Sequence, residues 1–99
     1  MITKDEILSF LKNHKNELFI DYQITKIGLF GSFAVDQENE FSDIDLIVEF
    51  QPETRNLSDK KAKLKELLNS RFNREIDICR EKYIKPYFKN QILKTAIYV

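Results

Sequence analysis

The 99-residue sequence contains one cysteine, one histidine, no tryptophan, and only two residues each of glycine and proline. One thiol excludes an internal disulfide, and one cysteine with one histidine leaves no ligand set for structural zinc. The scarcity of glycine and proline excludes collagen-like and low-complexity chains. No apolar run approaches the roughly 20 residues of a membrane-spanning helix, and Asp5 and Glu6 stand where a signal peptide would become apolar. We therefore expect a cytoplasmic protein with no membrane contact.

The charged residues are balanced in number but unevenly placed. Residues 1–50 carry 4 Lys and Arg against 10 Asp and Glu, whereas residues 51–99 carry 12 against 6. This split predicts one face that attracts cations and another that attracts anions, although two ordinary solvated surfaces would give the same pattern. A chain of this length with 42% hydrophobic residues buries one core, so we expect a single domain over residues 1–99.

Apolar periods in the first half predict a helix followed by two strands. Thr3 begins a capping box, and the apolar residues after it recur at helical spacing, which predicts a helix over residues 4–17. A β-branched run predicts a strand over 24–30, and alternating apolar and polar residues predict another over 43–50. Between these strands we expect one or two helical turns over 32–37.

The second half predicts a helix, a strand and a last helix. The first helix begins near Asn56 or Ser58, which are both preferred N-cap residues. Residues 74–80 alternate like a strand, and Pro86 suits the first turn of the last helix. We expect the apolar side of that helix to face inward, through Phe88, Ile92, Leu93, Ala96 and Ile97. This order predicts an α/β (α+β) fold, a small mixed β-sheet with helices packed on one side.

Two carboxylates share one face of the predicted strand 43–50. Side chains two positions apart on a strand point to the same side, so Asp43 and Asp45 lie next to each other while their apolar neighbours enter the core. Like charges at this spacing repel, and a divalent cation bound by both carboxylates would remove the conflict. Oxygen ligands of this kind suit magnesium, which takes its remaining ligands from water and phosphates.

Gly31 and Ser32 come where the strand 24–30 ends. Glycine lets the backbone approach a ligand closely, the Ser32 hydroxyl adds a donor, and exposed N–H groups in the following turn favour an anion. Asp77 alternates with apolar neighbours in the third strand and is the candidate third carboxylate of a two-metal site. Each residue alone is common on protein surfaces, but together they predict a site for phosphoryl transfer.

The order of these residues resembles a known family. The minimal nucleotidyltransferases of the DNA polymerase beta-like superfamily carry a similar pattern, which here reads Gly31-Ser32-Phe33-Ala34, Ser42-Asp43-Ile44-Asp45-Leu46 and Ile76-Asp77-Ile78. The closing segments Tyr83-Ile84-Lys85-Pro86 and Ile92…Ala96-Ile97-Tyr98-Val99 are also similar to that family's C-terminal helix. The resemblance therefore covers nearly the whole chain and implies the polymerase beta-like nucleotidyltransferase fold.

The resemblance also implies an activity and a partner. Asp43, Asp45 and Asp77 would be the catalytic residues and the ligands of two magnesium ions, and Gly31 and Ser32 would hold the triphosphate of the substrate ATP. Small members of the family act as type VII-like antitoxins of a HEPN-domain ribonuclease, and several transfer AMP to a tyrosine of that toxin. The implied assembly is a homo-oligomer or a hetero-oligomer with the toxin.

The chain departs from the family pattern at two positions. The family usually reads Gly-Ser-x-Ala-Arg-Gly, whereas Val35 and Asp36 occupy the last two places here. An arginine would stand near the nucleotide phosphates, so we expect its absence and the added negative charge to weaken nucleotide binding. Two other functions stay open: a catalytically weak or inactive antitoxin that blocks the toxin by binding, and a small-molecule nucleotidyltransferase subunit. No aromatic residue interrupts the lysine-rich stretch 60–65, so we expect no direct nucleic-acid binding.

Overall fold

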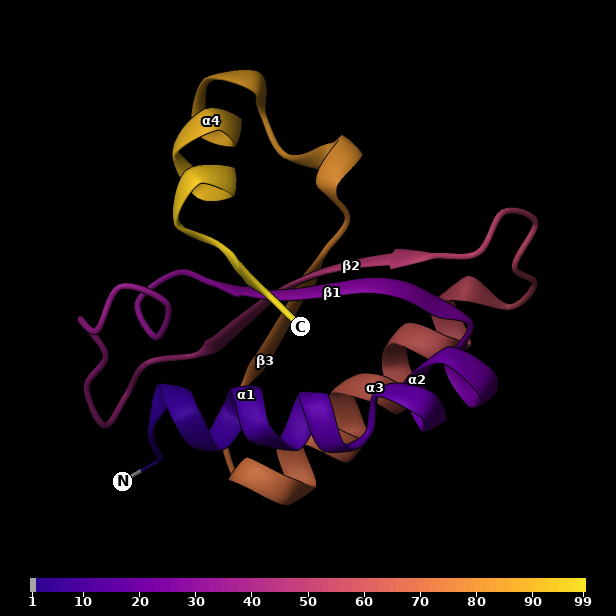
Figure 1. Cartoon of the computed structure of the whole chain (residues 1–99), viewed down its shortest axis with the longest axis horizontal. Helices are drawn as coiled ribbons and strands as arrows, with labels where there is room; N and C mark the ends of the chain where they lie inside the picture. Colours follow the sequence, from indigo (N-terminus) through magenta and orange to yellow (C-terminus); the bar gives the residue numbers. More distant parts are fainter. Residues whose placement is uncertain (1) are drawn as a thin grey trace.

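The computed structural model describes residues 2–99 and builds them into a four-stranded sheet with helices on both faces (Figure 1). The elements follow the order α1 (Lys4–Asn13), α2 (Lys15–Tyr22), β1 (Ile24–Phe30), β2 (Ile44–Phe50), α3 (Leu57–Phe72), β3 (Ile76–Cys79), the short 3₁₀ helix η1 (Glu81–Tyr83), α4 (Pro86–Thr95) and β4 (Ile97–Tyr98). Within residues 2–99, no helix combines the length and the apolar character needed to cross a membrane.

The sheet is mixed, as the sequence predicts. Its strand order is β3-β2-β1-β4, in which β1 runs antiparallel to both of its neighbours and β2 runs parallel to β3. The α3 helix provides the crossover between the two parallel strands, as such a pair requires. All three predicted strands are confirmed, with β2 and β3 slightly shorter than expected.

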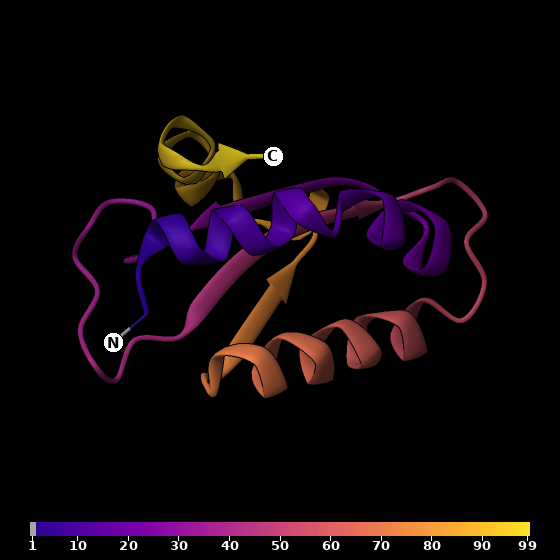
Figure 2. The same ribbon diagram turned by 60° about the horizontal axis from the view of Figure 1, so that its bottom comes forward.

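One face of the sheet carries the hydrophobic core. Ile44, Leu46 and Val48 alternate along β2, are at most 1% exposed, and pack with apolar residues of three helices. These helix residues are Ile7, Leu11, Leu18, Leu64, Leu68 and Phe72. Figure 1 shows α1, α2 and α3 together below the sheet, and the turned view in Figure 2 separates the indigo α1 from the orange α3. Burying one such aliphatic side chain contributes about 1.5–3 kcal/mol, so this face supplies most of the stabilisation.

The first predicted helix differs from the expectation in its length and continuity. Thr3 caps it as predicted, because its hydroxyl accepts a hydrogen bond from the Glu6 amide at 3.2 Å. The helix then breaks at His14, whose backbone has φ −104° and ψ 14°, and resumes as α2. The His14 ring stacks on Phe10 at 4.1 Å and its Nδ1 lies 2.8 Å from the Phe10 carbonyl oxygen, which fixes the turn. Helical structure therefore reaches Tyr22.

The C-terminal helix lies on the face opposite the core. Pro86 opens α4 as predicted, but α4 lies on the other face of the sheet from the remaining helices, and its apolar side is only half-buried at Ile92 and Leu93. No residue of α4 is buried, and Phe88 is 46% exposed. Figure 1 shows α4 above the sheet, whereas the other three helices lie below it. An amphipathic pattern specifies an apolar side but not which face of the sheet receives it.

The last residues form a strand that the sequence analysis assigned to this helix. Ile97 and Tyr98 pair with Leu29 and Gly28 of β1. A Cβ added to Gly28 would lie 2.7 Å from the Tyr98 ring, so the missing side chain is what lets the ring lie across the strand. Lys26 covers the same ring at 4.5 Å from its centroid. A glycine inside a strand marks such close approaches.

This contact predicts coupling between Gly28 and Tyr98. Gly28→Ala should lower the free energy of unfolding by about 1–3 kcal/mol, because the added methyl group overpacks the ring. In a Tyr98→Ala background the same change should cost much less. Urea denaturation of the two single variants and the double variant measures the coupling. An equal loss of unfolding free energy in both backgrounds would show that the position of the Tyr98 ring does not depend on Gly28.

Candidate active site

The parallel pairing of β2 and β3 brings two of the predicted site residues together. Asp45 and Asp77 are direct partners in the register, so neighbouring strands about 4.8 Å apart carry both carboxylates on one side. That side is the one facing away from the core, because Ile44 and Ile76 in the same register are buried below. Asp43 precedes β2 by one residue and is exposed.

The Asp45 carboxyl lies within the electrostatic influence of both Asp77 and Asp43. The pKa of the half-buried Asp45 carboxyl is raised from 3.8 to about 6, first by burial and then by the negative charges of Asp77 and Asp43. The same two strands place the half-buried thiol of Cys79 nearby, and burial followed by the charges of Asp77 and Asp45 raises its pKa. Cys79 therefore stays a neutral thiol near pH 7, as a packing residue would.

Gly31 lies against the Asp45 carboxylate. Its φ is +75°, in the left-handed region that favours glycine, and a Cβ at this position would collide with the Asp45 carboxylate oxygen. Both the backbone conformation and the space therefore require glycine here. The predicted phosphate residue and the predicted metal residues thus meet at one point, where β1 ends beside the start of β2.

The segment after Gly31 is a series of turns, so the predicted helical turns over 32–37 are not formed. The Ala34 amide donates to the Gly31 carbonyl at 3.1 Å and the Gln37 amide donates to the Ser32 carbonyl at 2.9 Å. Phe33 is fully buried and anchors the turn in the core. Ser32 is half-buried next to Gly31, so its hydroxyl and the turn amides, rather than a helix N-terminus, are the groups available to an anion.

The donor set fits magnesium together with phosphates. Within the described residues 2–99, no three or more Asp, Glu, His or Cys side chains are close enough to form a complete ligand set. Magnesium commonly takes only one or two carboxylates and completes its shell with water and substrate phosphates. Asp43, Asp45 and Asp77 could provide oxygen ligands of this kind, and Gly31, which lies against Asp45, and the adjacent Ser32 are the candidates for contacting a phosphate.

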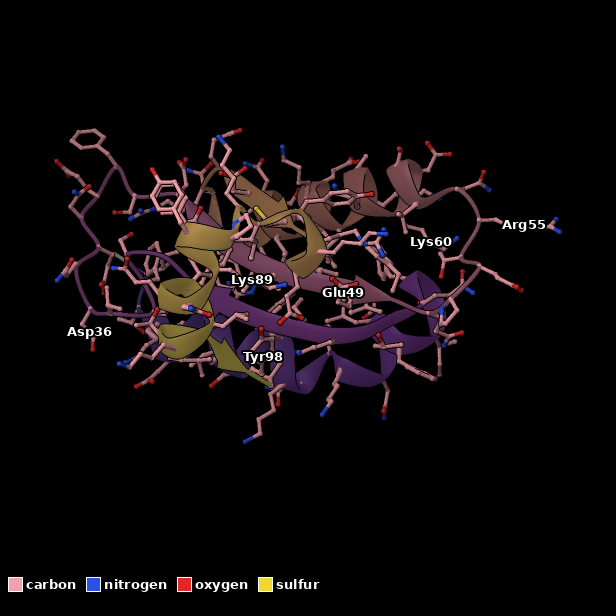
Figure 3. All side chains as sticks on the ribbon, turned by 90° about the horizontal axis from the view of Figure 1, so that it is seen from above. Asp36, Glu49, Arg55, Lys60, Lys89 and Tyr98 are labelled. Atoms are coloured by element: carbon pink, nitrogen blue, oxygen red, sulfur yellow. The ribbon has the colours of Figure 1, made fainter. Side chains whose placement is uncertain are left out.

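Asp36 points its charge away from these carboxylates. Its carboxylate forms an ion pair of 3.1 Å with Lys4 at the start of α1, and Figure 3 places it at the margin of the molecule. Its φ is +58°, which aspartate tolerates better than most residues and glycine tolerates best. The neighbouring Val35 is 40% exposed, so this position offers room for a longer side chain.

The sequence analysis missed a surface on the same face as the three carboxylates. Figure 3 looks onto this face, with α4 in front of the strand that carries Glu49. Tyr83 and Tyr87 are 72% and 81% exposed, and lysines alternate with them in the sequence of η1 and α4. The sequence does indicate this surface, because lysines are interleaved with Tyr83, Tyr87 and Phe88. The apolar residues of this helix instead favoured an interpretation as core.

Three comparisons identify similar proteins. Residues 10–99 match the nucleotidyltransferase domain family. The protein adenylyltransferase MntA of Thermococcus cleftensis is 31% identical over 99 residues, which cover 100% of this chain and 98% of that protein. A solved minimal nucleotidyltransferase has a TM-score of 0.77 and 25% identity over 97% of this chain and 95% of the other. A toxin–antitoxin crystal structure with AMP-PNP shares the fold, with a TM-score of 0.65 and 21% identity over 88% of this chain and 70% of that one.

The raised pKa of Asp45 predicts a pH-dependent stability. Between pH 3.8 and about 6 the folded protein holds a proton that the unfolded chain has released, so stability falls as pH rises through this range. Asp45→Asn cannot ionise and should be more stable than wild type by about 1–2 kcal/mol at pH 8, with little difference at pH 4. Urea denaturation at the two pH values measures the gain.

Glu66→Gln is the matched control, because Glu66 is an exposed carboxylate on the opposite side of the sheet, in α3. It should leave stability nearly unchanged at both pH values. A gain for Asp45→Asn that is equal at pH 4 and pH 8 would contradict the assignment of the raised pKa to Asp45.

Proposed function

The chain belongs to the nucleotidyltransferase domain family, and from this premise we propose that it transfers AMP from ATP to a tyrosine hydroxyl of a HEPN-domain toxin, for which it is the antitoxin. The observation that carries the proposal is the meeting of Gly31 with the Asp45–Asp77 pair at one end of the sheet. A phosphate-binding turn beside paired carboxylates is the arrangement that metal-assisted phosphoryl transfer requires.

The similar proteins support the chemistry and the partner to different degrees. The relative from Thermococcus cleftensis is a protein adenylyltransferase and matches over the whole of both chains, which supports AMP transfer to a protein. The toxin–antitoxin structure contains a nucleotide triphosphate analogue, which supports ATP as the substrate and a toxin as the partner. The HEPN identity of the toxin rests on the resemblance of the sequence motifs.

The residues take distinct roles in the proposed reaction. Gly31 and Ser32 would hold the triphosphate, and Asp43, Asp45 and Asp77 would hold the magnesium ions. Magnesium, when bound, neutralises phosphate charge and lowers the pKa of the attacking hydroxyl. The tyrosine oxygen bonds to the α-phosphorus, the bond from that phosphorus to the β-phosphate oxygen breaks, and pyrophosphate leaves with the electron pair. The hydroxyl proton passes to Asp77.

The partner has to reach Asp77 from the side of the sheet that faces away from the core. On that side lies α4, with Lys89 on it (Figure 3), and η1 and α4 carry the exposed rings of Tyr83, Tyr87 and Phe88. A standard protein–protein interface buries about 800 Å² on each partner, far more than the three carboxylates offer. Partner binding and AMP transfer are therefore separable by mutation.

Asp77→Asn tests the transfer. The side chain is exposed, so the variant should fold normally and bind the toxin. It should lose adenylylation by about a hundredfold to a thousandfold, because an electrostatic contribution to the transition state is removed. Wild type or variant is incubated with the toxin, ATP and magnesium, and both chains are weighed by mass spectrometry. A mass increase of one AMP on the toxin is expected with wild type alone.

The same mass-spectrometry assay includes a control variant. Asp59→Asn, an exposed aspartate at the start of α3, should behave as wild type. If wild type adds no AMP but still inhibits the toxin in a stoichiometric complex, the function is that of a binding antitoxin without activity. Transfer to a small molecule instead of the toxin would favour the small-molecule nucleotidyltransferase.

Val35 stands where the family pattern has an arginine, so we expect weak nucleotide binding that a substitution can strengthen. Val35→Arg with Asp36→Gly restores the usual family pattern, and one charge-assisted phosphate contact contributes about 1.5–3 kcal/mol. We expect the double variant to bind ATP with magnesium at least about tenfold more tightly in calorimetry. Asp36→Gly alone is the control, because it relieves the φ of +58° and breaks only the exposed ion pair with Lys4. Tight ATP binding by wild type would show that another group replaces the arginine.

A further inference from the structure

Arg74 connects two segments that are far apart in the sequence. It lies between α3 and β3, and its Nη1 donates hydrogen bonds to the Ser42 carbonyl oxygen at 2.7 Å and the Asn39 carbonyl oxygen at 3.0 Å. Its guanidinium carbon lies 5.5 Å from the centroid of the buried Phe33 ring. The side chain is half-buried, so these contacts are partly shielded from water.

The segment that Arg74 contacts is a turn that closes on itself. The Ser42 amide donates to the Asn39 carbonyl at 3.1 Å, the Asn39 amide donates to the Ser42 hydroxyl at 2.9 Å, and the Phe41 amide donates to the Asn39 side-chain oxygen at 2.8 Å. These bonds shape the turn but do not attach it to the rest of the protein. Arg74 provides that attachment through both carbonyl groups.

The attachment determines where Asp43 stands. Asp43 lies outside β2, so it lacks the ladder that fixes Asp45. Its neighbour on one side, Ser42, is held by Arg74, and its neighbour on the other side, Ile44, donates its amide to the Glu75 carbonyl at 2.9 Å. The short stretch 74–77 therefore holds the backbone on both sides of Asp43 and also carries Asp77.

We propose that Arg74 is a positioning residue that holds Asp43 beside Asp45 and Asp77, and that also packs on the Phe33 ring next to Ser32. The Arg74 guanidinium thus connects the turn after Gly31, through the Phe33 ring, to the segment before Asp43, through the Asn39 and Ser42 carbonyls. The effect on metal binding rests on the proposed function, whereas the effect on the backbone around Asp43 does not. The two planar donors of arginine suit this double contact better than the ammonium of lysine.

Arg71 offers a matched control within the same region of the chain. Its guanidinium carbon lies 5.6 Å and 5.3 Å from the Phe10 and Phe72 ring centroids, so it makes cation–π contacts like Arg74. It makes no hydrogen bond to the 39–43 turn among the described residues. Arg71→Met therefore removes an arginine and its ring contacts without detaching the turn.

The test compares Arg74→Met, Arg74→Lys and Arg71→Met with wild type by amide hydrogen exchange and manganese binding. Arg74→Met should speed exchange of the Ser42 amide at least about tenfold while the Leu46 amide in β2 stays protected. It should weaken Mn²⁺ binding, followed by water-proton relaxation, by at least about tenfold, as losses of outer-shell partners do. Arg74→Lys should recover part of both effects, and Arg71→Met should change neither.

The outcomes distinguish a positioning role of Arg74 from a general effect on stability, and they distinguish both from the proposed function. Uniformly faster exchange across β1 and β2 in Arg74→Met, or Ser42 exchange within twofold of wild type, would overturn the proposal. If wild type binds no Mn²⁺, the metal site fails, and the exchange arm still decides the role of Arg74. If Arg74→Met does not fold, Arg74→Lys decides, because the proposal requires faster Ser42 exchange than in wild type in that variant too.

Discussion

The parallel register between β2 and β3 is the constraint on which the site depends. Ile44 is paired with Ile76 and both are buried, so a shift by one residue would place Asp77 in the core and an isoleucine in water. The same register puts Asp45 beside Asp77 on the other side. Burying each isoleucine contributes about 1.5–3 kcal/mol, which offsets the unfavourable burial of the Asp45 carboxylate beside the charge of Asp77. The core therefore holds in place a charge arrangement that would not form by itself.

The two faces of the sheet separate stability from chemistry. The lower face holds the hydrophobic core, whereas the upper face carries Asp45, Asp77 and Glu49 in alternating positions. Ile47 alternates with the core residues of β2 and is nonetheless fully buried, which agrees with the cover that α4 gives to this face in Figure 1. Glu49 accepts hydrogen bonds from the Glu81 amide and Arg80, which attach η1 to the strand. A small domain with one core can thus leave most of one sheet face to a ligand and a partner.

The sequence predicted the strands and the grouping of carboxylates because both depend on a period of two residues. Alternation in β2 and β3 specifies which side chains share a face, and Gly31 beside Asp45 follows from the end of β1. The position of α4 and the existence of β4 depend on tertiary contacts that leave little local signal. Tyr98 joins the sheet because Gly28 has no side chain, and this needs the pairing of residues 70 positions apart. The ion pair between Asp36 and Lys4 and the clamp of Arg74 on Ser42 depend on similarly distant residues.

Asp43 shows why the site needs more than strand alternation. Strand pairing fixes the backbone at Asp45 and Asp77. Asp43 precedes Ile44, the first residue of β2, and therefore lies outside this pairing. Ordering one backbone residue costs about 1–2 kcal/mol, and nothing in the turn itself directs Asp43 toward its two partners. Two hydrogen bonds from the stretch 74–77 offset this cost. Arg74 donates to the carbonyl of Ser42, before Asp43, and the Glu75 carbonyl accepts from the amide of Ile44, after it. The strand that supplies the third carboxylate is therefore preceded by the residues that position the first.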